Sequence, residues 1–207
     1  MGKRWLRERR KDSYYMKAKE LNYRSRAAFK LLQIHDRFNV VREGDAVLDL
    51  GANPGGWSQV AMELAGSEGI AIAVDLKPIE PIPGVVFVRG DARTDGVLAD
   101  VRDALKEKGK EYVDVIVSDM SPNISGNYDM DQARSVELCE AVLEAAERLL
   151  RPGGRIVMKV FEGDMFLDLV EKVKGRFISV RRHAPKASRP SSSEIYIIAK
   201  GFRPPRR

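Results

Sequence analysis

The stretch AVLDLGANPGGW, residues 46–57, joins a short apolar run to a glycine-rich turn and the first residues of a helix. A turn with Gly51, Gly55 and Gly56 lets a ligand approach the backbone closely where a strand of an open α/β sheet ends. The glycine spacing differs from the G-x-G-x-x-G fingerprint of dinucleotide sites. We therefore expect a ligand site at this turn, with a nucleoside that carries no phosphate chain as the ligand.

Further apolar runs follow this stretch and alternate with helical segments. Strands are expected at residues 70–76, 85–88, 113–119 and 155–161, and helices at 57–65, about 95–108 and about 130–150. The turn Arg151-Pro152-Gly153-Gly154 ends the last of these helices. Residues 194–202 are predicted to form a final strand that runs antiparallel at an edge. This order predicts a Rossmann-like α/β fold, a mostly parallel doubly wound sheet with an antiparallel last strand.

Upstream of this region, residues 1–24 form a predicted basic N-terminal arm. The arm contains several aromatic residues: Trp5, Tyr14, Tyr15 and Tyr23. Aromatic side chains among basic ones either stack on nucleic-acid bases or attach the arm to the core, and the pattern favours neither. Beyond the arm, Ser25 is expected to cap a helix over about residues 26–38. Residues 25–207 are predicted to form a single domain.

The formal net charge of +6 is unevenly distributed along the 207 residues. Residues 1–42 carry 13 Lys and Arg against 4 Asp and Glu, residues 43–171 carry 12 against 25, and residues 172–207 carry 11 against 1. Two basic ends on one domain indicate a surface for nucleic acid, with an ordinary solvated face as the alternative.

The composition also excludes several classes of protein. No apolar run approaches the ~20 residues that span a bilayer, the basic segments lack an amphipathic stripe, and the N-terminus has no secretory signal. Cys139 is the single cysteine, so no internal disulfide can form. We expect a soluble, cytoplasmic protein that does not bind membranes.

Two carboxylates follow the predicted second and third strands. Asp75 ends the second strand, 24 residues after Gly51, where an acid can accept hydrogen bonds from both ribose hydroxyls. Asp91 follows the third strand, in VRGDAR, where it can accept from an adenine amino group. Each acid alone is equally well explained as a cap or a solvated turn residue. Acids at successive strand ends favour a nucleoside with an amino-acid tail, which is the structure of S-adenosylmethionine.

A lysine inside an apolar strand is costly to bury unless it is paired or neutral. Lys159, in RIVMKVF, is such a residue close to the carboxyl end of its predicted strand, and Asp119 closes another strand at the same edge. Both therefore point toward the crevice in which α/β proteins bind ligands. Glu194 opens the last strand and Lys30 lies on the helix before the sheet. The alternatives are a Lys159 side chain that extends to solvent from the strand end and a solvated position for Lys30.

A set of motifs runs in one order across nearly the whole chain: RWLRE near the start, YRSRAAFKLLQI (23–34), LDLGANPGGWSQV (48–60), VDLKPI (74–79), GDAR (90–93), VSDMSPNISG (117–126), PGGRIVMKVFEG (152–163) and SSSEIYIIA (191–199). Together they resemble the FtsJ/RrmJ family of ribose 2′-O-methyltransferases. The combination of SDMSPNISG with the lysine-bearing strand is the specific part, whereas the glycine-rich turn marks only the wider methyltransferase fold. The resemblance implies an S-adenosylmethionine-dependent methyltransferase fold, S-adenosyl-L-methionine as cofactor and RNA as substrate.

The resemblance also implies roles for individual residues. The catalytic set falls on Lys30, Asp119, Lys159 and Glu194. The cofactor contacts fall on the glycine-rich turn and the strand ends: Gly51, Gly55, Trp57, Asp75, Asp91 and Asp119. Asn53 stands where many bacterial members have alanine, a difference that bears on the shape of the turn. No metal is expected, because His35 and His183 are isolated, and Cys139 is expected to pack in the core.

Methyl transfer to a ribose hydroxyl needs an in-line approach and removal of the hydroxyl proton. Lys159 is the expected proton acceptor, provided that burial and the like charge of Lys30 favour its neutral form. Asp119 and Glu194 would orient the two lysines and stabilise the ammonium that forms. In the alternative mechanism, Lys159 steers the oxygen while water takes the proton.

The expected substrate is a uridine ribose of large-subunit ribosomal RNA, within the large ribosomal subunit or its precursor, and no oligomer is required. RNA contacts are expected from the two basic ends: Lys3 to Lys11, Arg24, Arg26, Arg181, Arg182, Lys186 and Arg189. Because the chain ends at FRPPRR, the core and the arm are expected to hold the RNA without a further domain.

Three other functions compete with this one. Transfer RNA as the substrate would use the same motifs, which do not separate the two. A non-catalytic RNA-binding assembly factor is disfavoured by the presence of all four residues of the catalytic set. A nicotinamide-dependent oxidoreductase is disfavoured by the missing dinucleotide fingerprint.

Overall fold

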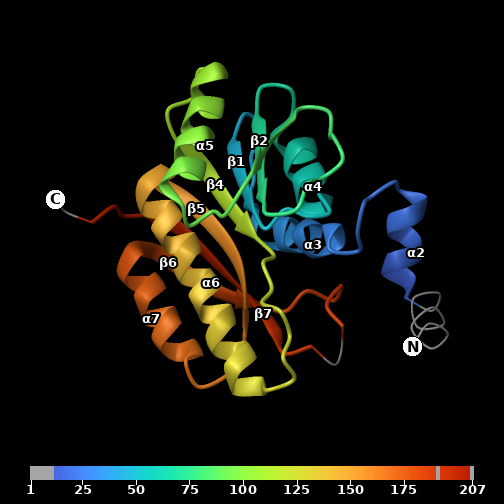
Figure 1. Cartoon of the computed structure of the whole chain (residues 1–207), viewed down its shortest axis with the longest axis vertical. Helices are drawn as coiled ribbons and strands as arrows, with labels where there is room; N and C mark the ends of the chain where they lie inside the picture. Colours follow the sequence, from blue (N-terminus) through green and yellow to red (C-terminus); the bar gives the residue numbers. More distant parts are fainter. Residues whose placement is uncertain (1–11, 190–191, 206–207) are drawn as a thin grey trace.

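A computed structural model describes residues 12–189 and 192–205 and places a seven-stranded sheet at the centre of the molecule (Figure 1). Its strands are β1 (Ala46–Leu50), β2 (Ile70–Asp75), β3 (Val85–Arg89), β4 (Val113–Ser118), β5 (Leu150–Phe161), β6 (Phe177–His183) and β7 (Glu194–Phe202). They follow the order β3-β2-β1-β4-β5-β7-β6 across the sheet. Strands β1 to β5 are parallel, and β7 pairs antiparallel with both β5 and β6. The predicted Rossmann-like sheet with an antiparallel last strand is confirmed.

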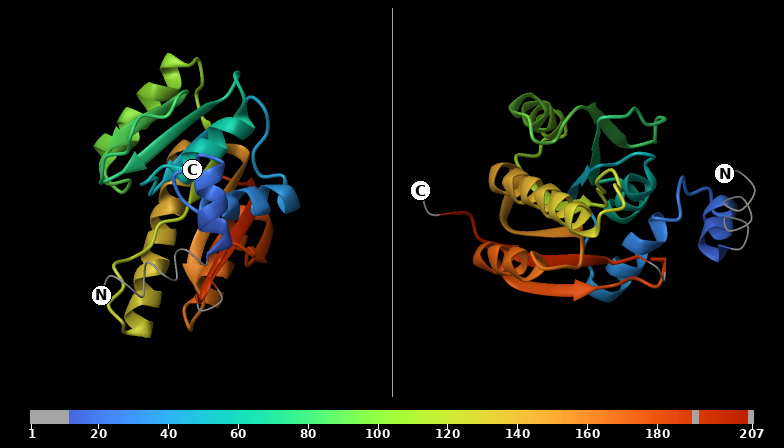
Figure 2. Two further views of the ribbon diagram at one scale, coloured as in Figure 1. Left: turned by 90° about the vertical axis from the view of Figure 1, so that its right-hand side faces the viewer. Right: turned by 60° about the horizontal axis from the view of Figure 1, so that its bottom comes forward.

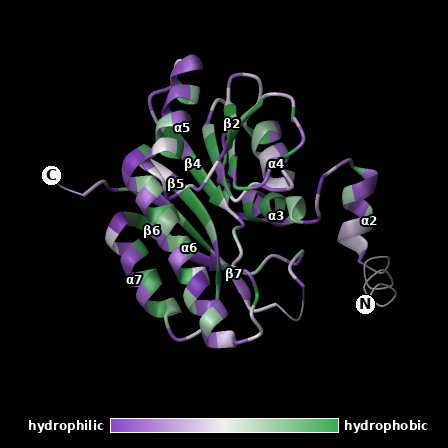
Figure 3. Cartoon of the chain, viewed as in Figure 1, coloured by the Kyte–Doolittle hydropathy of each residue, from purple (hydrophilic) through white to green (hydrophobic). Residues whose placement is uncertain are grey.

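Helices cover both faces of this sheet because its strands bury side chains in both directions. The helices α3 (Ala28–Phe38) and α4 (Gly56–Ala65) pack on one face, and α5 (Asp95–Glu107), α6 (Tyr128–Leu149) and α7 (Phe166–Arg176) pack on the other (Figure 2). In β1, Val47 packs in the core beneath α3 and α4, whereas Leu48 and Leu50 pack in the core beneath α5, α6 and α7. Figure 3 shows the apolar residues gathered along the central strands.

The elements predicted between residues 46 and 161 form where they were expected, with one difference at β5. This strand begins at Leu150 rather than at residue 155. Val113 lies opposite Leu150 and Val115 opposite Arg155, so residues 151–154 interrupt the regular register. The predicted Pro-Gly turn therefore forms as an irregularity within the strand pairing, directly after α6 ends.

The expected edge position of residues 194–202 is wrong. β7 lies between β5 and β6, and β6 occupies the edge. The sequence did not predict β6 because the polar residues Ser179, Arg181 and Arg182 interrupt the apolar pattern of a buried strand. The helix α7 was also missed, although the spacing of its buried Phe166, Leu169, Val170 and Val173 is helical.

A helix, α2 (Ser13–Glu20), forms within the predicted N-terminal arm. Asp12 caps it by accepting a hydrogen bond from Tyr15 N at 3.1 Å. The rings of Tyr14 and Tyr23 lie 5.6 and 5.7 Å from the ring of Phe29 on α3. These contacts favour attachment to the core over base stacking for both tyrosines. Trp5 and the basic cluster from Lys3 to Lys11 lie outside the described residues, and the domain boundary at residue 24 stays a prediction.

The expected capping role of Ser25 is wrong. The helix α3 begins at Ala28, its N-cap Ala27 makes no side-chain capping bond, and the Ser25 hydroxyl has no hydrogen-bond partner. Ser25 instead faces α4, since a Cβ placed on Gly56 would lie 2.5 Å from its Oγ. Of the helices in residues 12–189 and 192–205, none is long and apolar enough to cross a membrane.

Candidate active site

The turn after β1 is shaped so that a side chain does not fit at its start. Gly51 has φ +80°, and a Cβ there would lie 2.2 Å from Met120 Cγ. The N–H groups of Gly51 and Ala52 donate to Val74 O at 2.9 and 3.1 Å, which holds the turn against β2. Gly55, with φ +108°, is the N-cap of α4. The backbone of the turn therefore lies open to a ligand at the carboxyl end of the sheet.

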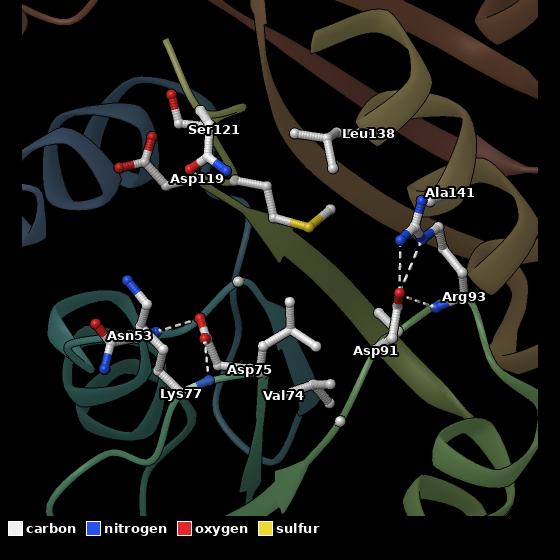
Figure 4. A pocket seen from close by; sticks show the side chains of 16 residues that line it. Asn53, Val74, Asp75, Lys77, Asp91, Arg93, Asp119, Ser121, Leu138 and Ala141 are labelled. Atoms are coloured by element: carbon white, nitrogen blue, oxygen red, sulfur yellow. Dashed lines mark hydrogen bonds and ion pairs between the residues drawn. The ribbon is translucent and has the colours of Figure 1, made fainter. Parts of the chain in front are cut away.

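A cavity of about 370 Å³ opens beside this turn (Figure 4). It lies where the strand order reverses between β1 and β4, the position at which open α/β sheets bind ligands. Its lining combines acids with apolar side chains and includes Gly51, Asn53, Val74, Asp75, Asp91, Asp119, Met120 and Leu138. The volume lies in the range that is typical of small-molecule sites. Gly55 and Trp57 are not among the lining residues.

The two acids predicted to bind the nucleoside are held by backbone and arginine donors. Figure 4 shows the Asp75 carboxylate between Asn53 and Lys77, whose N–H groups donate to it at 2.9 and 2.8 Å. Asp91 forms an ion pair with Arg93 at 2.6 Å, and the Arg93 hydrogen bonds hold the pKa of Asp91 below its ordinary value. Asp91 therefore stays ionised at neutral pH.

The residues of the cavity fit the nucleoside part of S-adenosylmethionine. Each carboxylate offers about four acceptor positions, so Asp75, which accepts two hydrogen bonds, keeps acceptors for ribose hydroxyls. Asp91 accepts four hydrogen bonds from Arg93, so Arg93 occupies the positions that an adenine amino group would use. Val74, Met120 and Leu138 supply apolar surface for a purine ring. Holding the nucleoside by acids and an apolar wall needs no phosphate site.

Beside the cavity, four charged side chains from four elements meet. Lys159 on β5 donates from Nζ to the main-chain oxygen of Asp119 at 2.7 Å and forms an ion pair with Asp119 Oδ1 at 3.1 Å. Lys30 on α3 lies 2.7 Å from Glu194 Oε1 and 3.8 Å from Asp119 Oδ2. The structure thus brings together all four residues of the predicted catalytic set.

Both lysines of this cluster are removed from water. Lys30 is 9% exposed and Lys159 is 8% exposed, so neither is a solvated surface lysine. Burial would raise the pKa of Glu194, but the charge of Lys30 holds it below its ordinary value. Asp119 lies between the two lysines and its carboxylate contacts both. The alternatives in which Lys30 is solvated or Lys159 extends to solvent are therefore wrong.

The sequence did not single out Tyr196, which completes the cluster. Its side chain is fully buried, and its hydroxyl donates to Asp119 Oδ1 at 2.6 Å. The Tyr196 ring lies 5.7 Å from the ring of Trp57, and Lys30 Nζ lies 5.7 Å from the centre of the Tyr196 ring. The detectable signal was its position two residues after Glu194, since side chains two apart in a strand share a face.

Trp57 lies behind the glycine-rich turn rather than in the cavity. It is 3% exposed, packs against Tyr196, and its Nε1 donates to Ala27 O at 2.7 Å. This arrangement joins the turn to the start of α3, which carries Lys30. The predicted direct contacts of Trp57 and Gly55 with the cofactor stay predictions.

The basic residues expected to contact RNA fall into two groups. The guanidinium of Arg24 donates to the carbonyls of Pro54, Glu80 and Pro81, and that of Arg26 to Asp12 and Ala187 O. These two arginines are thus engaged within the protein. The second group of expected RNA contacts is exposed and consists of Arg181, Arg182, Lys186 and Arg189.

Two solved structures share this architecture. A protein described as a ribosomal RNA methyltransferase from Plasmodium falciparum superposes with a TM-score of 0.78 at 30% identity, over 87% of this chain and 98% of that one. Fibrillarin from Aeropyrum pernix, solved with S-adenosyl-L-methionine bound, gives a TM-score of 0.56 at 19% identity, over 86% and 75%. The second similarity concerns the fold alone. The fold is that of the S-adenosylmethionine-dependent methyltransferases.

Sequence comparison gives the family. The model of the FtsJ-like methyltransferases matches residues 23–202, and the chain belongs to this family. It is 52% identical over 190 residues to ribosomal RNA large subunit methyltransferase E of Methanothrix thermoacetophila, covering 92% of this chain and 72% of the relative. The identity to the protein of the same name from Methanocaldococcus jannaschii is 46% over 202 residues, covering 97% and 82%. The predicted family is confirmed, and with it a ribose 2′-O-methyltransferase that uses S-adenosyl-L-methionine.

Proposed function

We propose that this protein methylates the 2′-hydroxyl of a uridine ribose in large-subunit ribosomal RNA. The observation that carries the proposal is the Lys30, Asp119, Lys159 and Glu194 cluster at the edge of a cavity that fits S-adenosylmethionine. A basic amine beside a methyl-donor site is the group that removal of a hydroxyl proton requires.

In the proposed mechanism, S-adenosylmethionine when bound supplies a methyl group activated by its sulfonium. Lys159 Nζ, as a neutral amine, accepts the proton of the ribose hydroxyl while the oxygen forms its bond to the methyl carbon and the carbon–sulfur bond breaks. The ammonium that results is stabilised by the Asp119 main-chain oxygen at 2.7 Å and by Asp119 Oδ1 at 3.1 Å. Lys30 balances the second Asp119 oxygen and is itself held by Glu194.

Relatives and surface charge support the choice of RNA. The relatives from Methanothrix thermoacetophila and Methanocaldococcus jannaschii carry large-subunit ribosomal RNA in their name. The exposed residues Arg181, Arg182, Lys186 and Arg189 offer positive charge to phosphates. A substrate in the large ribosomal subunit or its precursor would place the reaction in the cytoplasm. One chain supplies the cavity and the whole cluster, so no oligomer is needed.

The test is nucleoside mass spectrometry after incubation with S-adenosylmethionine and either large-subunit particles or bulk tRNA. We expect 2′-O-methyluridine from the particles. Lys159→Ala should lower the rate by about 10²–10⁴-fold, the usual contribution of a general base. It should leave the affinity for S-adenosylmethionine, measured by calorimetry, nearly unchanged. Lys172→Ala is the matched control, because Lys172 is an exposed lysine on α7 paired with Glu140.

The other outcomes distinguish the competing functions. A product from tRNA alone would keep the chemistry and overturn the ribosomal substrate. No methylated ribose from either RNA, with cofactor binding intact, would favour a non-catalytic assembly factor. Full activity of Lys159→Ala would remove Lys159 from its proposed role.

A further inference from the structure

A short segment before α3 is hydrogen-bonded at several points to α4 and to the glycine-rich turn. We call residues 22–27 the tether. Gln59 on α4 donates from Nε2 to Asn22 O at 3.1 Å and accepts from Arg24 N at 2.9 Å. At the end of the tether, Ala27 O accepts from Trp57 Nε1 at 2.7 Å. No residue of the tether lines the cavity, so the tether follows the glycine-rich turn on the side away from the cavity.

Arg24 contacts two separate loops through its guanidinium group. Its Nη1 donates to Pro54 O at 3.3 Å and to Glu80 O at 2.5 Å, and its Nη2 donates to Pro81 O at 2.7 Å. Pro54 belongs to the glycine-rich turn, whereas Glu80 and Pro81 belong to the loop between β2 and β3. One guanidinium thus joins the two loops that border the cavity.

The same two loops carry cavity residues at their other ends. Asn53 N donates to Asp75 Oδ2 at 2.9 Å, and Asn53 Nδ2 donates to Pro78 O at 3.0 Å. Asn53 and Asp75 line the cavity, but Arg24 does not. Pro54, which accepts a hydrogen bond from Arg24, directly follows Asn53 in the turn. The Arg24 contacts therefore lie directly behind the cavity wall.

Arginine suits this position and lysine does not. A planar guanidinium presents five donors in a fixed fork, so it can serve three carbonyls at once, whereas an ammonium is a single point charge. The aliphatic part of the side chain also packs closely on the turn, since a Cβ placed on Gly55 would lie 3.1 Å from Arg24 Cδ.

We propose that Arg24 is a positioning residue for the cofactor: it holds the glycine-rich turn and the β2–β3 loop in the arrangement that binds S-adenosylmethionine, and it is not an RNA contact. The inference rests on the proposed function only for the identity of the cofactor. It replaces the role in RNA binding that the basic sequence around Arg24 suggests.

The experiment titrates the full chain with S-adenosylmethionine by calorimetry. Arg24→Gln should raise the Kd about tenfold or more, because a hydrogen bond from a charged group contributes about this factor to an equilibrium. Arg24→Lys should fall between Arg24→Gln and the unaltered chain. Arg42→Gln, which removes an exposed arginine before β1, is the matched control and should leave the Kd unchanged.

Two further readouts separate positioning from a general loss of structure. Millimolar guanidinium should restore much of the cofactor affinity of Arg24→Ala, since it can occupy the vacated place, and it should not improve Arg42→Gln. The affinity of Arg24→Gln for single-stranded RNA should equal that of the unaltered chain. Restoration by guanidinium would not occur if the variant were simply misfolded.

Each alternative result has one meaning. Equal cofactor affinity of Arg24→Gln and the unaltered chain would overturn the positioning role. Weaker RNA binding by Arg24→Gln with normal cofactor binding would return Arg24 to the RNA surface. An unaltered chain that does not bind S-adenosylmethionine would overturn the proposed function itself, and with it the inference.

Discussion

Asp49 is a carboxylate in the middle of the molecule, on β1 and 1% exposed. Burial raises its pKa to about 7, and the charges of Asp119 and Asp75 act in the same direction. A hydrogen bond from Ser58 Oγ at 2.6 Å opposes the shift, and Asp49 Oδ1 has no partner. The folded protein therefore holds a proton at Asp49 that the unfolded chain releases at lower pH.

This difference makes stability depend on pH. The folded-state pKa lies above the unfolded value of 3.8, so the stabilising contribution is complete below pH 3.8 and is lost as the pH rises toward about 7. We expect the free energy of unfolding to fall, relative to Asp49→Asn, by at most about 1.4 kcal/mol per pH unit over this range. Urea unfolding of both proteins between about pH 4 and 8 measures it. A constant difference between the two would contradict the assigned protonation.

The site residues differ in how visible they are in the sequence. Lys159 stands out because its neighbours in RIVMKVF are apolar, so the local sequence alone shows that a charged side chain lies in a buried strand. Tyr196 does not, because a tyrosine in IYIIA is an ordinary strand residue and its bond to Asp119 joins positions 77 apart. Arg24 was assigned to RNA for a related reason. Local basic composition does not show that its guanidinium faces backbone carbonyls 30 to 57 residues away.

At the scale of elements, the parallel strands were predictable and the edge was not. β1, β2 and β4 are buried on both faces, so they appear as continuous apolar runs. β6 is half exposed and carries Arg181 and Arg182 outward, so it was taken for part of a basic end. The place of β7 inside the sheet depends on β6, and missing the one misplaced the other.

A buried ion pair joins β5 to the residue just before β1. Arg155 on β5 donates from Nη2 to both oxygens of Asp45, just before β1, at 2.9 Å each. Asp45 is 6% exposed and Arg155 is 3% exposed. Such a pair costs desolvation on both sides, and removing one partner leaves an unpaired buried charge.

We therefore expect Asp45→Ala to lower the free energy of unfolding by about 3–5 kcal/mol. The double variant Asp45→Ala with Arg155→Met should regain most of this loss, because it removes the unpaired guanidinium and fills its volume. Urea unfolding of the single variant, the double variant and the unaltered chain gives the comparison. A double variant as unstable as Asp45→Ala would show that the pair itself, rather than the orphaned charge, accounts for the loss.

At the scale of the whole molecule, one segment from each of the two basic regions of the sequence lies beside the catalytic cluster. Arg26 forms an ion pair with Asp12 before α2 and donates to Ala187 O in the loop between β6 and β7. In Figure 1, α2, α3 and this loop all lie on the right-hand side of the molecule. Lys30 and Glu194 come from these same two segments. The acidic middle of the sequence supplies the cofactor cavity, and these two segments supply Lys30 and Glu194 of the cluster beside it.

The loop between β6 and β7 presents its charges outward for a local reason. Ala187 is fully buried in a cluster with Phe29, and its N–H donates to Gln33 Oε1 at 3.0 Å. With Ala187 fixed inward, its neighbours Lys186 and Arg189 lie exposed, a few residues before Glu194. We expect these two charges to meet phosphates next to the nucleotide that is methylated.

The affinity for RNA should therefore depend steeply on salt, and these two residues should account for part of the slope. Each phosphate contact to a single strand contributes about −0.7 to the slope of log K against log salt, so Lys186→Gln with Arg189→Gln should make the slope shallower by about 1.4. Lys106→Gln with Lys108→Gln, at the C-terminal end of α5, removes the same net charge from exposed positions and should leave the slope unchanged. Fluorescence titration of a short single-stranded RNA at several salt concentrations measures all three proteins. Equal slopes for the two double variants would mean that net charge alone acts on RNA, and that the loop beside Glu194 makes no phosphate contact of its own.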